Sequence, residues 1–138
     1  MKNVYMKKII SLMILININP LMSANWDLVS FNDETDNFID TDSIKNSGGY
    51  IYYWRLADYK VLREYSDSRV YKSTMIYYKG DCNVFRELPL SGNIYSENMG
   101  KGEILHSLDF EEKWQYPPPD SISEIALEVV CKYFFKDN

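Results

Sequence analysis

Two cysteines, Cys82 and Cys131, constrain the fold of this 138-residue chain more than any other feature. Cys131 closes a run with helical periodicity, residues 121–131, whereas Cys82 lies in a region with the period of two that is typical of β-strands. A bond between the two residues would tie a helix to a sheet. Within a monomer only one pairing is available.

The run at residues 121–131 is predicted to be an amphipathic helix with a defined start. Ser121 and Glu124 have the spacing of a capping box, in which the serine oxygen accepts from the third helical N–H and the glutamate reaches back. The apolar residues recur at the three-and-four spacing of one helical face. We expect the buried face to hold Ile122, Ile125, Ala126, Val129, Val130 and Tyr133, and the solvated side to hold Ser123, Glu124, Glu128 and Lys132.

The first 24 residues predict a cleaved export signal. Lysines precede an apolar run at residues 9–16, and Ala24 offers a small residue for cleavage. The run is far shorter than the roughly 20 residues that cross a bilayer, so no stable span is expected after cleavage. The alternative is an amphipathic first helix of the domain. No cysteine follows the run, so we expect residues 25–138 to be periplasmic or secreted, without a lipid anchor.

Export also determines the expected state of the cysteines. An oxidising compartment allows a disulfide to form and persist. Closing the loop between Cys82 and Cys131 would remove freedom of the denatured chain worth roughly 4 kcal/mol in the chain-entropy model. The alternative is two buried free thiols. We predict the disulfide.

A chain of this length is predicted to form one domain, and its body from residue 25 onward is β-rich. In the stretch 50–56, Tyr50, Tyr52, Trp54 and Leu56 share one face, and Ile51, Tyr53 and Arg55 the other. Residues 58–68 are charged and without a period, and we expect a mobile loop. A turn is predicted at 79–81. Pro89 is expected to end its strand or to mark a sheet edge.

Few residues suit catalysis or metal binding. His106 is the only histidine and no G-x-S-x-G motif accompanies it, so a surface histidine is favoured over a small hydrolase. The acidic run at residues 33–42 lacks the EF-hand register, with Ile44 where an oxygen ligand should stand, so a solvated loop is favoured over a calcium site. We predict a non-enzymatic protein without metal or cofactor.

The balance of charge argues against nucleic acid as a partner. After removal of the leader, the chain holds 12 basic and 20 acidic residues, a formal charge of −8. Such an excess of acid repels phosphate backbones. We expect a protein partner instead.

Tyrosines are concentrated in the central sheet region and are the positive functional signal. Tyrosine supplies rigid amphipathic contact area and is enriched at recognition surfaces. The predicted binding surface is formed by Tyr52, Tyr53, Tyr71, Tyr77 and Tyr78. The alternative is that these rings cover a sheet face in internal packing.

A set of ordered marks extends over nearly the whole mature chain. The marks are Trp26-x-x-Val29, Asp40 and Ile44 before Gly49, Trp54, Tyr71-x-Ser73, Asp81-Cys82, Tyr95-Ser96, Met99-Gly100-x-Gly102, Trp114, Pro119-x-Ser121 and Val130-Cys131. Together they resemble the surface-adhesin protein E family of Gram-negative bacteria. The resemblance implies an α+β domain in which an antiparallel sheet of about six strands carries a C-terminal helix linked to it by the disulfide.

The resemblance also implies an adhesin-like binding protein for host extracellular-matrix or plasma proteins, such as laminin, vitronectin and plasminogen. The alternative is a periplasmic accessory protein that binds another envelope component and never contacts a host. An exposed edge strand would in addition allow two copies to pair as a homodimer.

Overall fold

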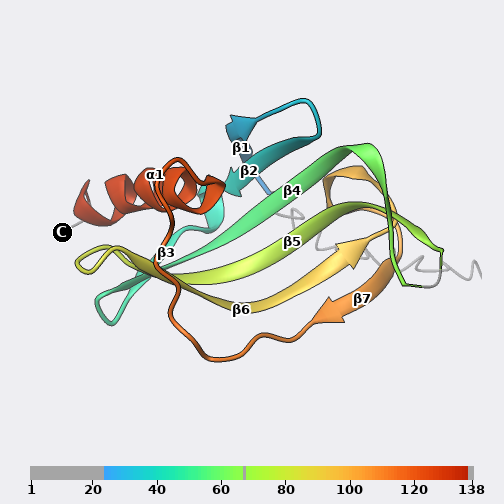
Figure 1. Ribbon diagram of the computed structural model, residues 1–138. Coiled ribbons are helices and arrows are strands. Elements are labelled where there is room, and N and C mark those ends of the chain that lie inside the picture. The colour runs from blue at the N-terminus through green and yellow to red at the C-terminus, as the bar shows by residue number, and fades with distance from the viewer. Residues whose placement is uncertain (1–23, 67, 137–138) are drawn as a thin grey trace, which may run out of the picture.

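The computed structural model describes residues 24–66 and 68–136 as one antiparallel sheet with a long helix packed on one face (Figure 1). Apart from Ala24, the predicted signal peptide lies outside the described residues. The elements in chain order are β1 (Trp26–Phe31), β2 (Thr35–Asp40), the 3₁₀ helix η1 (Thr41–Ser43), β3 (Lys45–Ser47), β4 (Tyr50–Glu64), β5 (Val70–Asp81), β6 (Arg86–Tyr95), the 3₁₀ helix η2 (Asn98–Gly100), β7 (Ile104–Leu108) and α1 (Ile122–Lys136).

The sheet has seven strands in the order β1-β2-β4-β5-β6-β7, and the short β3 pairs with the beginning of β4 beside β2. Every pairing is antiparallel. The chain therefore meanders through hairpins, with only β3 leaving the simple order. The predicted α+β fold with an antiparallel sheet of about six strands is confirmed.

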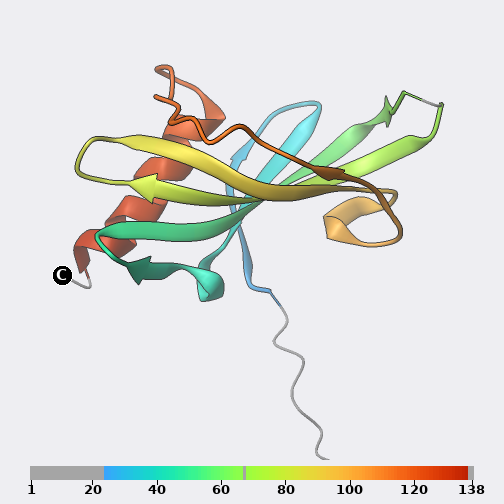
Figure 2. The same ribbon diagram turned by 90° about the horizontal axis from the view of Figure 1, so that it is seen from below.

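α1 lies across the end of the sheet formed by the start of β4, β3 and the β5–β6 turn, and it leaves the opposite end uncovered (Figures 1 and 2). We call the face under the helix the inner face and the opposite one the outer face. Ile51 and Tyr53 of β4 and Leu127 and Val130 of α1 are each 0% exposed and form the centre of the core. Burial of this apolar surface is the main force that holds the helix on the sheet.

The predicted disulfide between Cys82 and Cys131 is confirmed. The two sulfur atoms lie 2.08 Å apart and the two Cα atoms 5.5 Å apart. Cys131 faces the sheet from the third turn of α1, and Cys82 lies in the turn between β5 and β6. The bond therefore fixes the helix to the end of a hairpin.

The helix begins where the capping box predicts. The Glu124 N–H donates to Ser121 Oγ at 3.1 Å, and the Glu124 carboxylate accepts from the Asp120 N–H at 2.6 Å instead of from Ser121. The predicted buried face is partly wrong, because Tyr133 is 38% exposed. The buried positions are Ala126, Leu127, Val130, Cys131 and Phe134. This rotation follows from the disulfide, which requires Cys131 to face the sheet.

A glycine under the helix permits its close approach to the sheet. A Cβ added to Gly80 of β5 would lie 2.8 Å from Ile51 Cγ2 and 3.0 Å from Leu127 Cδ1. Both distances are shorter than ordinary van der Waals contacts, so any larger residue would push α1 away from β4 and β5.

The predicted mobile loop at residues 58–68 is wrong, because β4 continues to Glu64 and β5 begins at Val70. Charged side chains on this hairpin pair with β2 and with the turn before it. Lys60 Nζ lies 2.8 Å from Asp36 Oδ1, and Arg63 Nη2 lies 2.7 Å from Glu34 Oε2. The projecting end of the hairpin lies beyond the helix, so its strands need no apolar alternation and give no period in the sequence.

The predicted turn at residues 79–81 lies too early. β5 runs to Asp81, and the turn is formed by residues 82–85. The Asp81 carboxylate accepts hydrogen bonds from two backbone N–H groups of the turn at 3.2 Å, which is how Asp stabilises an Asx turn.

Pro89 lies within β6 and does not end it. Pro89 does not mark a sheet edge either, because β6 lies between β5 and β7. β7 pairs only with residues 92–95 of β6, so Pro89 lies outside the β6–β7 ladder. A shift in register next to Pro89 accommodates the missing N–H.

Within the two described ranges, none of the helices combines the length and the apolar character that crossing a membrane requires.

Candidate functional site

Two of the five predicted surface tyrosines are buried under the helix. Tyr53 is 0% exposed and Tyr78 is 5% exposed, and their rings stack on the inner face with centroids 5.5 Å apart. Both belong to the apolar core that contacts α1. Their rings are therefore inside the fold, and the packing alternative describes these two residues.

The hydroxyls of these two tyrosines belong to a buried polar network. Tyr53 donates to Glu87 Oε2 at 2.6 Å, and Arg55 Nη1 lies 3.4 Å from Glu87 Oε1. Arg55 also donates to the Tyr78 hydroxyl and, at 3.2 Å, to Ser123 Oγ of α1. Three strands and the helix thus meet at one guanidinium group, which satisfies polar groups that would be costly to bury alone.

Burial and charge shift the pKa values inside this network. Burial raises the pKa of Tyr53 well above its ordinary value, and the negative charge of Glu87 raises it further. Burial alone would lower the pKa of Arg55, but its contacts with Tyr78 and Glu87 outweigh that effect and the pKa is raised. Tyr53 therefore stays neutral and Arg55 stays charged under ordinary conditions.

Two other predicted tyrosines, Tyr52 and Tyr77, meet on the outer face. Their ring centroids are 6.2 Å apart, and the Tyr77 ring also lies 4.9 Å from the Trp54 ring. All three side chains are partly exposed. Partial burial, with a smaller effect from Tyr52, raises the pKa of Tyr77. The alternation along β4 brings Tyr52 and Trp54 to the face opposite α1.

A second aromatic pair continues this surface toward β3. The rings of Tyr50 and Trp114 stack with centroids 5.8 Å apart. Lys79 Nζ lies 3.9 Å from the Tyr50 centroid, and the Arg86 guanidinium lies 4.4 Å from the Trp114 centroid. Such contacts hold cations on aromatic faces. We use the name outer aromatic patch for the set Tyr50, Tyr52, Trp54, Tyr77 and Trp114.

Trp114 reaches the patch through a long-range backbone contact. The connector between β7 and α1 pairs with β6, where the Glu87 N–H donates to Gln115 O at 2.9 Å and the Gln115 N–H donates to Glu87 O at 2.8 Å. Gln115 itself belongs to none of the named strands. Sequence reasoning did not place Trp114, Lys79 or Arg86 at the site, and the connector carries no periodic signal that would have placed them.

The remaining predicted residue, Tyr71, lies away from the outer aromatic patch. Its ring packs edge-on against Tyr59 with centroids 5.5 Å apart, near the projecting end of the β4–β5 hairpin. The fold therefore brings Tyr52 and Tyr77 together, buries Tyr53 and Tyr78, and leaves Tyr71 at a separate place.

The residues considered as candidates for catalysis or metal binding lie away from the outer aromatic patch and from the buried polar network. His106 is exposed on β7 and its ring stacks against Tyr65 at 5.2 Å. Asp36 pairs with Lys60, and Asp40 accepts from the Asn25 N–H at 3.0 Å. In residues 24–66 and 68–136, no three His, Cys, Asp or Glu side chains are grouped as metal ligands would be.

Comparison with known proteins gives one family and one fold. A sequence model of the family described as Surface-adhesin protein E matches residues 26–132. A structure of Haemophilus influenzae protein E is similar, with a TM-score of 0.61 and 14% identity over 82% of this chain and 95% of that one. A structure of protein E from non-typeable Haemophilus influenzae has a TM-score of 0.59 and 15% identity over 85% and 83% of the two chains. No curated protein sequence matches this chain. At this level of identity the structural likeness shows a shared fold.

Proposed function

The chain belongs to the surface-adhesin protein E family, and on that premise we propose that it is an exported, non-enzymatic binding protein that holds a protein partner on its outer aromatic patch. Family membership supports an adhesin-like surface protein. The structures of Haemophilus influenzae protein E share its fold. For the partner we propose a host extracellular-matrix or plasma protein.

The observation that carries this proposal is the partial exposure of five aromatic rings on a sheet face that α1 does not cover. The rings of Tyr52, Trp54 and Tyr77 pack against one another, so their rotamers are already restricted before a partner binds. Restriction in the free state lowers the entropy lost on binding. Tyr, Trp and Arg are also the residues most often found as binding hot spots.

Positive charges at the outer aromatic patch also favour binding of a protein partner. Lys79 and Arg86 lie over rings of the patch in a chain whose overall formal charge is −5, and Arg86 is paired with Asp81 at 3.1 Å. These cations on an acidic protein would orient an acidic segment of a partner toward the rings. We therefore expect binding to weaken as ionic strength rises.

An envelope component is the alternative partner. Homodimerisation is a further proposal, and β1 and β7, the outermost strands of the sheet, are the edges that a second copy would pair with.

The test is binding of the mature protein to immobilised laminin, vitronectin and plasminogen, and in parallel to envelope extract. The variant Tyr52→Ala/Tyr77→Ala should weaken binding by about 2 kcal/mol, roughly thirtyfold, with unchanged melting. Tyr133→Ala, which removes a partly exposed ring of α1, is the matched control. Equal affinity of the double variant and the unaltered protein would refute the role of the patch. Capture from envelope extract alone would favour the periplasmic alternative.

A further inference from the structure

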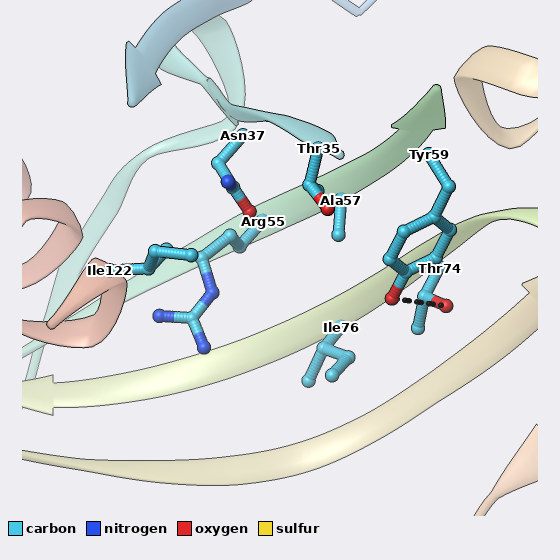
Figure 3. A pocket seen from close by; sticks show the side chains of 8 residues that line it. All are labelled: Thr35, Asn37, Arg55, Ala57, Tyr59, Thr74, Ile76 and Ile122. Atoms are coloured by element: carbon cyan, nitrogen blue, oxygen red, sulfur yellow. Dashed lines mark hydrogen bonds between the residues drawn. The ribbon is translucent and has the colours of Figure 1, made fainter. Parts of the chain in front are cut away.

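A hollow of about 260 Å³ opens on the inner face just beyond the first turn of α1 (Figure 3). Side chains from β2, β4, β5 and the first residue of α1, Ile122, line it. Its polar groups are the hydroxyls of Thr35, Tyr59 and Thr74, the amide of Asn37 and the guanidinium of Arg55. The hollow is on the opposite face of the sheet from the outer aromatic patch, so the proposed protein partner would not fill it.

Asn37 is an unusual residue in this hollow because its amide is buried without a partner. The residue is 3% exposed, and its Nδ2 atom makes no hydrogen bond within the described chain. A buried donor without an acceptor is costly, and such groups in native proteins commonly mark a missing ligand or water. The Nδ2 atom has no exposed surface, so contact with a ligand requires the amide to turn about its Cβ–Cγ bond, a soft torsion.

Among the described residues that line the hollow, Arg55 is the one with a charge, and none carries a carboxylate. Its charge is partly balanced by Glu87, so a bound anion would share the guanidinium with that carboxylate. Glu87, which pairs with Arg55, is only 1% exposed and does not line the hollow. Ile122 places the N-terminus of the 15-residue helix α1 at the wall, where the helix dipole is positive.

We propose that this hollow binds a small carboxylic acid in its carboxylate form. The carboxylate would accept hydrogen bonds from Asn37 and Arg55, and a short alkyl chain would contact Ala57, Ile76 and Ile122. The volume of about 260 Å³ is below the roughly 300–1,000 Å³ that is usual for ligand pockets. A ligand of only a few non-hydrogen atoms therefore fits.

Titration of the folded protein with butanoate, followed by ¹H–¹⁵N NMR, tests this proposal. Butanamide is the uncharged analogue of the same shape and butylammonium the cationic one, and sodium chloride keeps the ionic strength constant. Saturable shifts of the Asn37 side-chain amide signals are expected with butanoate. Butanamide should bind about tenfold more weakly, because it lacks the charge-assisted hydrogen bonds. Equal binding of butanoate and butanamide, or no saturable shift, would overturn the proposal.

Asn37→Leu separates binding from folding. Because this variant removes an unpaired buried donor, its melting temperature should be equal or higher, while butanoate binding, followed through the backbone signals of β4 and β5, should fall by about tenfold. Asn83→Ser, at an exposed position of the β5–β6 turn, should bind butanoate normally. Ala57→Leu, which fills the hollow, gives a second loss-of-binding variant.

Unchanged binding by both Asn37→Leu and Ala57→Leu would contradict the assignment. Partner binding at the outer aromatic patch should be the same with and without butanoate, so failure of either proposal leaves the other testable.

Discussion

Glu87 is a charged residue inside the fold, since its carboxylate is 1% exposed and lies between the Tyr53 hydroxyl and the Arg55 guanidinium. A buried pair of this kind contributes little compared with an apolar pair of the same size. Loss of one partner is costly, because the remaining charge has no compensation.

Arg55→Met should therefore lower the free energy of unfolding by about 3–5 kcal/mol, because Glu87 would keep a buried charge with only Tyr53 as its partner. Urea denaturation of the variant measures this loss. Adding Glu87→Gln to Arg55→Met should restore part of the stability, since the buried charge is then removed. Strict additivity of the two substitutions would show that the pair is not coupled.

The raised pKa of Tyr53 predicts how the stability of the protein changes in alkaline solution. Its pKa in the folded protein is raised above the ordinary 10.0, so the unfolded chain loses this proton first as the pH rises. The stabilising contribution is therefore complete below pH 10.0 and is lost as the pH rises toward the folded-state pKa. Tyr78 shifts in the same direction, first through burial.

Denaturation at a series of pH values above and below 10.0, combined with the near-ultraviolet absorbance of tyrosinate, checks this expectation. Tyr53→Phe should be less stable at neutral pH, because Glu87 loses a donor, but its stability should fall less steeply in alkali. Parallel curves for the variant and the unaltered protein would contradict the assignment.

At the scale of elements, the disulfide joins α1 to the β5–β6 turn across a sequence separation of 49 residues. The double variant Cys82→Ala/Cys131→Ala should lose about 4 kcal/mol of stability in the chain-entropy model. Chemical denaturation with and without a reductant measures the loss. The reductant should destabilise the unaltered protein to a similar extent and leave the variant unchanged. Equal midpoints for the oxidised and reduced protein would show that packing alone holds the helix.

Alternation predicted correctly which side chains of β4 share a face, but it does not say which face a helix will cover. Tyr52 and Tyr53 are neighbours in the sequence and were predicted together as a binding surface, yet only Tyr52 is on the uncovered side. The orientation of the helix determines which face of the sheet is covered. The position of Cys131 orients α1, and that orientation brings Leu127 and Val130 against the face that holds Tyr53.

Other parts of the site depend on contacts that no local pattern encodes. Trp114 lies beside Tyr50 because the connector pairs with β6 through Gln115, far away in the sequence. Arg55 was placed on the correct face of its strand, but its partner Glu87 comes from a different hairpin. The sequence was sufficient for the fold class, the disulfide and the start of α1, whereas side-chain partnerships between strands required the three-dimensional arrangement.

At the scale of the whole molecule, the two faces of the sheet carry different groups. The inner face is divided between the helix, with its core and polar network, and the hollow beyond the first turn of α1. The outer face carries the aromatic rings and cations proposed for recognition. Substitutions at the outer aromatic patch should therefore change binding with little effect on stability, and substitutions under α1 should do the opposite.

The covalent link encloses β6, β7 and the exposed connector between Cys82 and Cys131. Trypsin that cuts at the exposed Lys113 should therefore leave a nicked molecule whose two pieces migrate as one band without reductant and as two bands with it. Release of a C-terminal fragment before reduction would contradict this expectation. A single proteolytic event in that segment would thus leave the protein in one covalent piece, which favours persistence in a compartment where proteases are common.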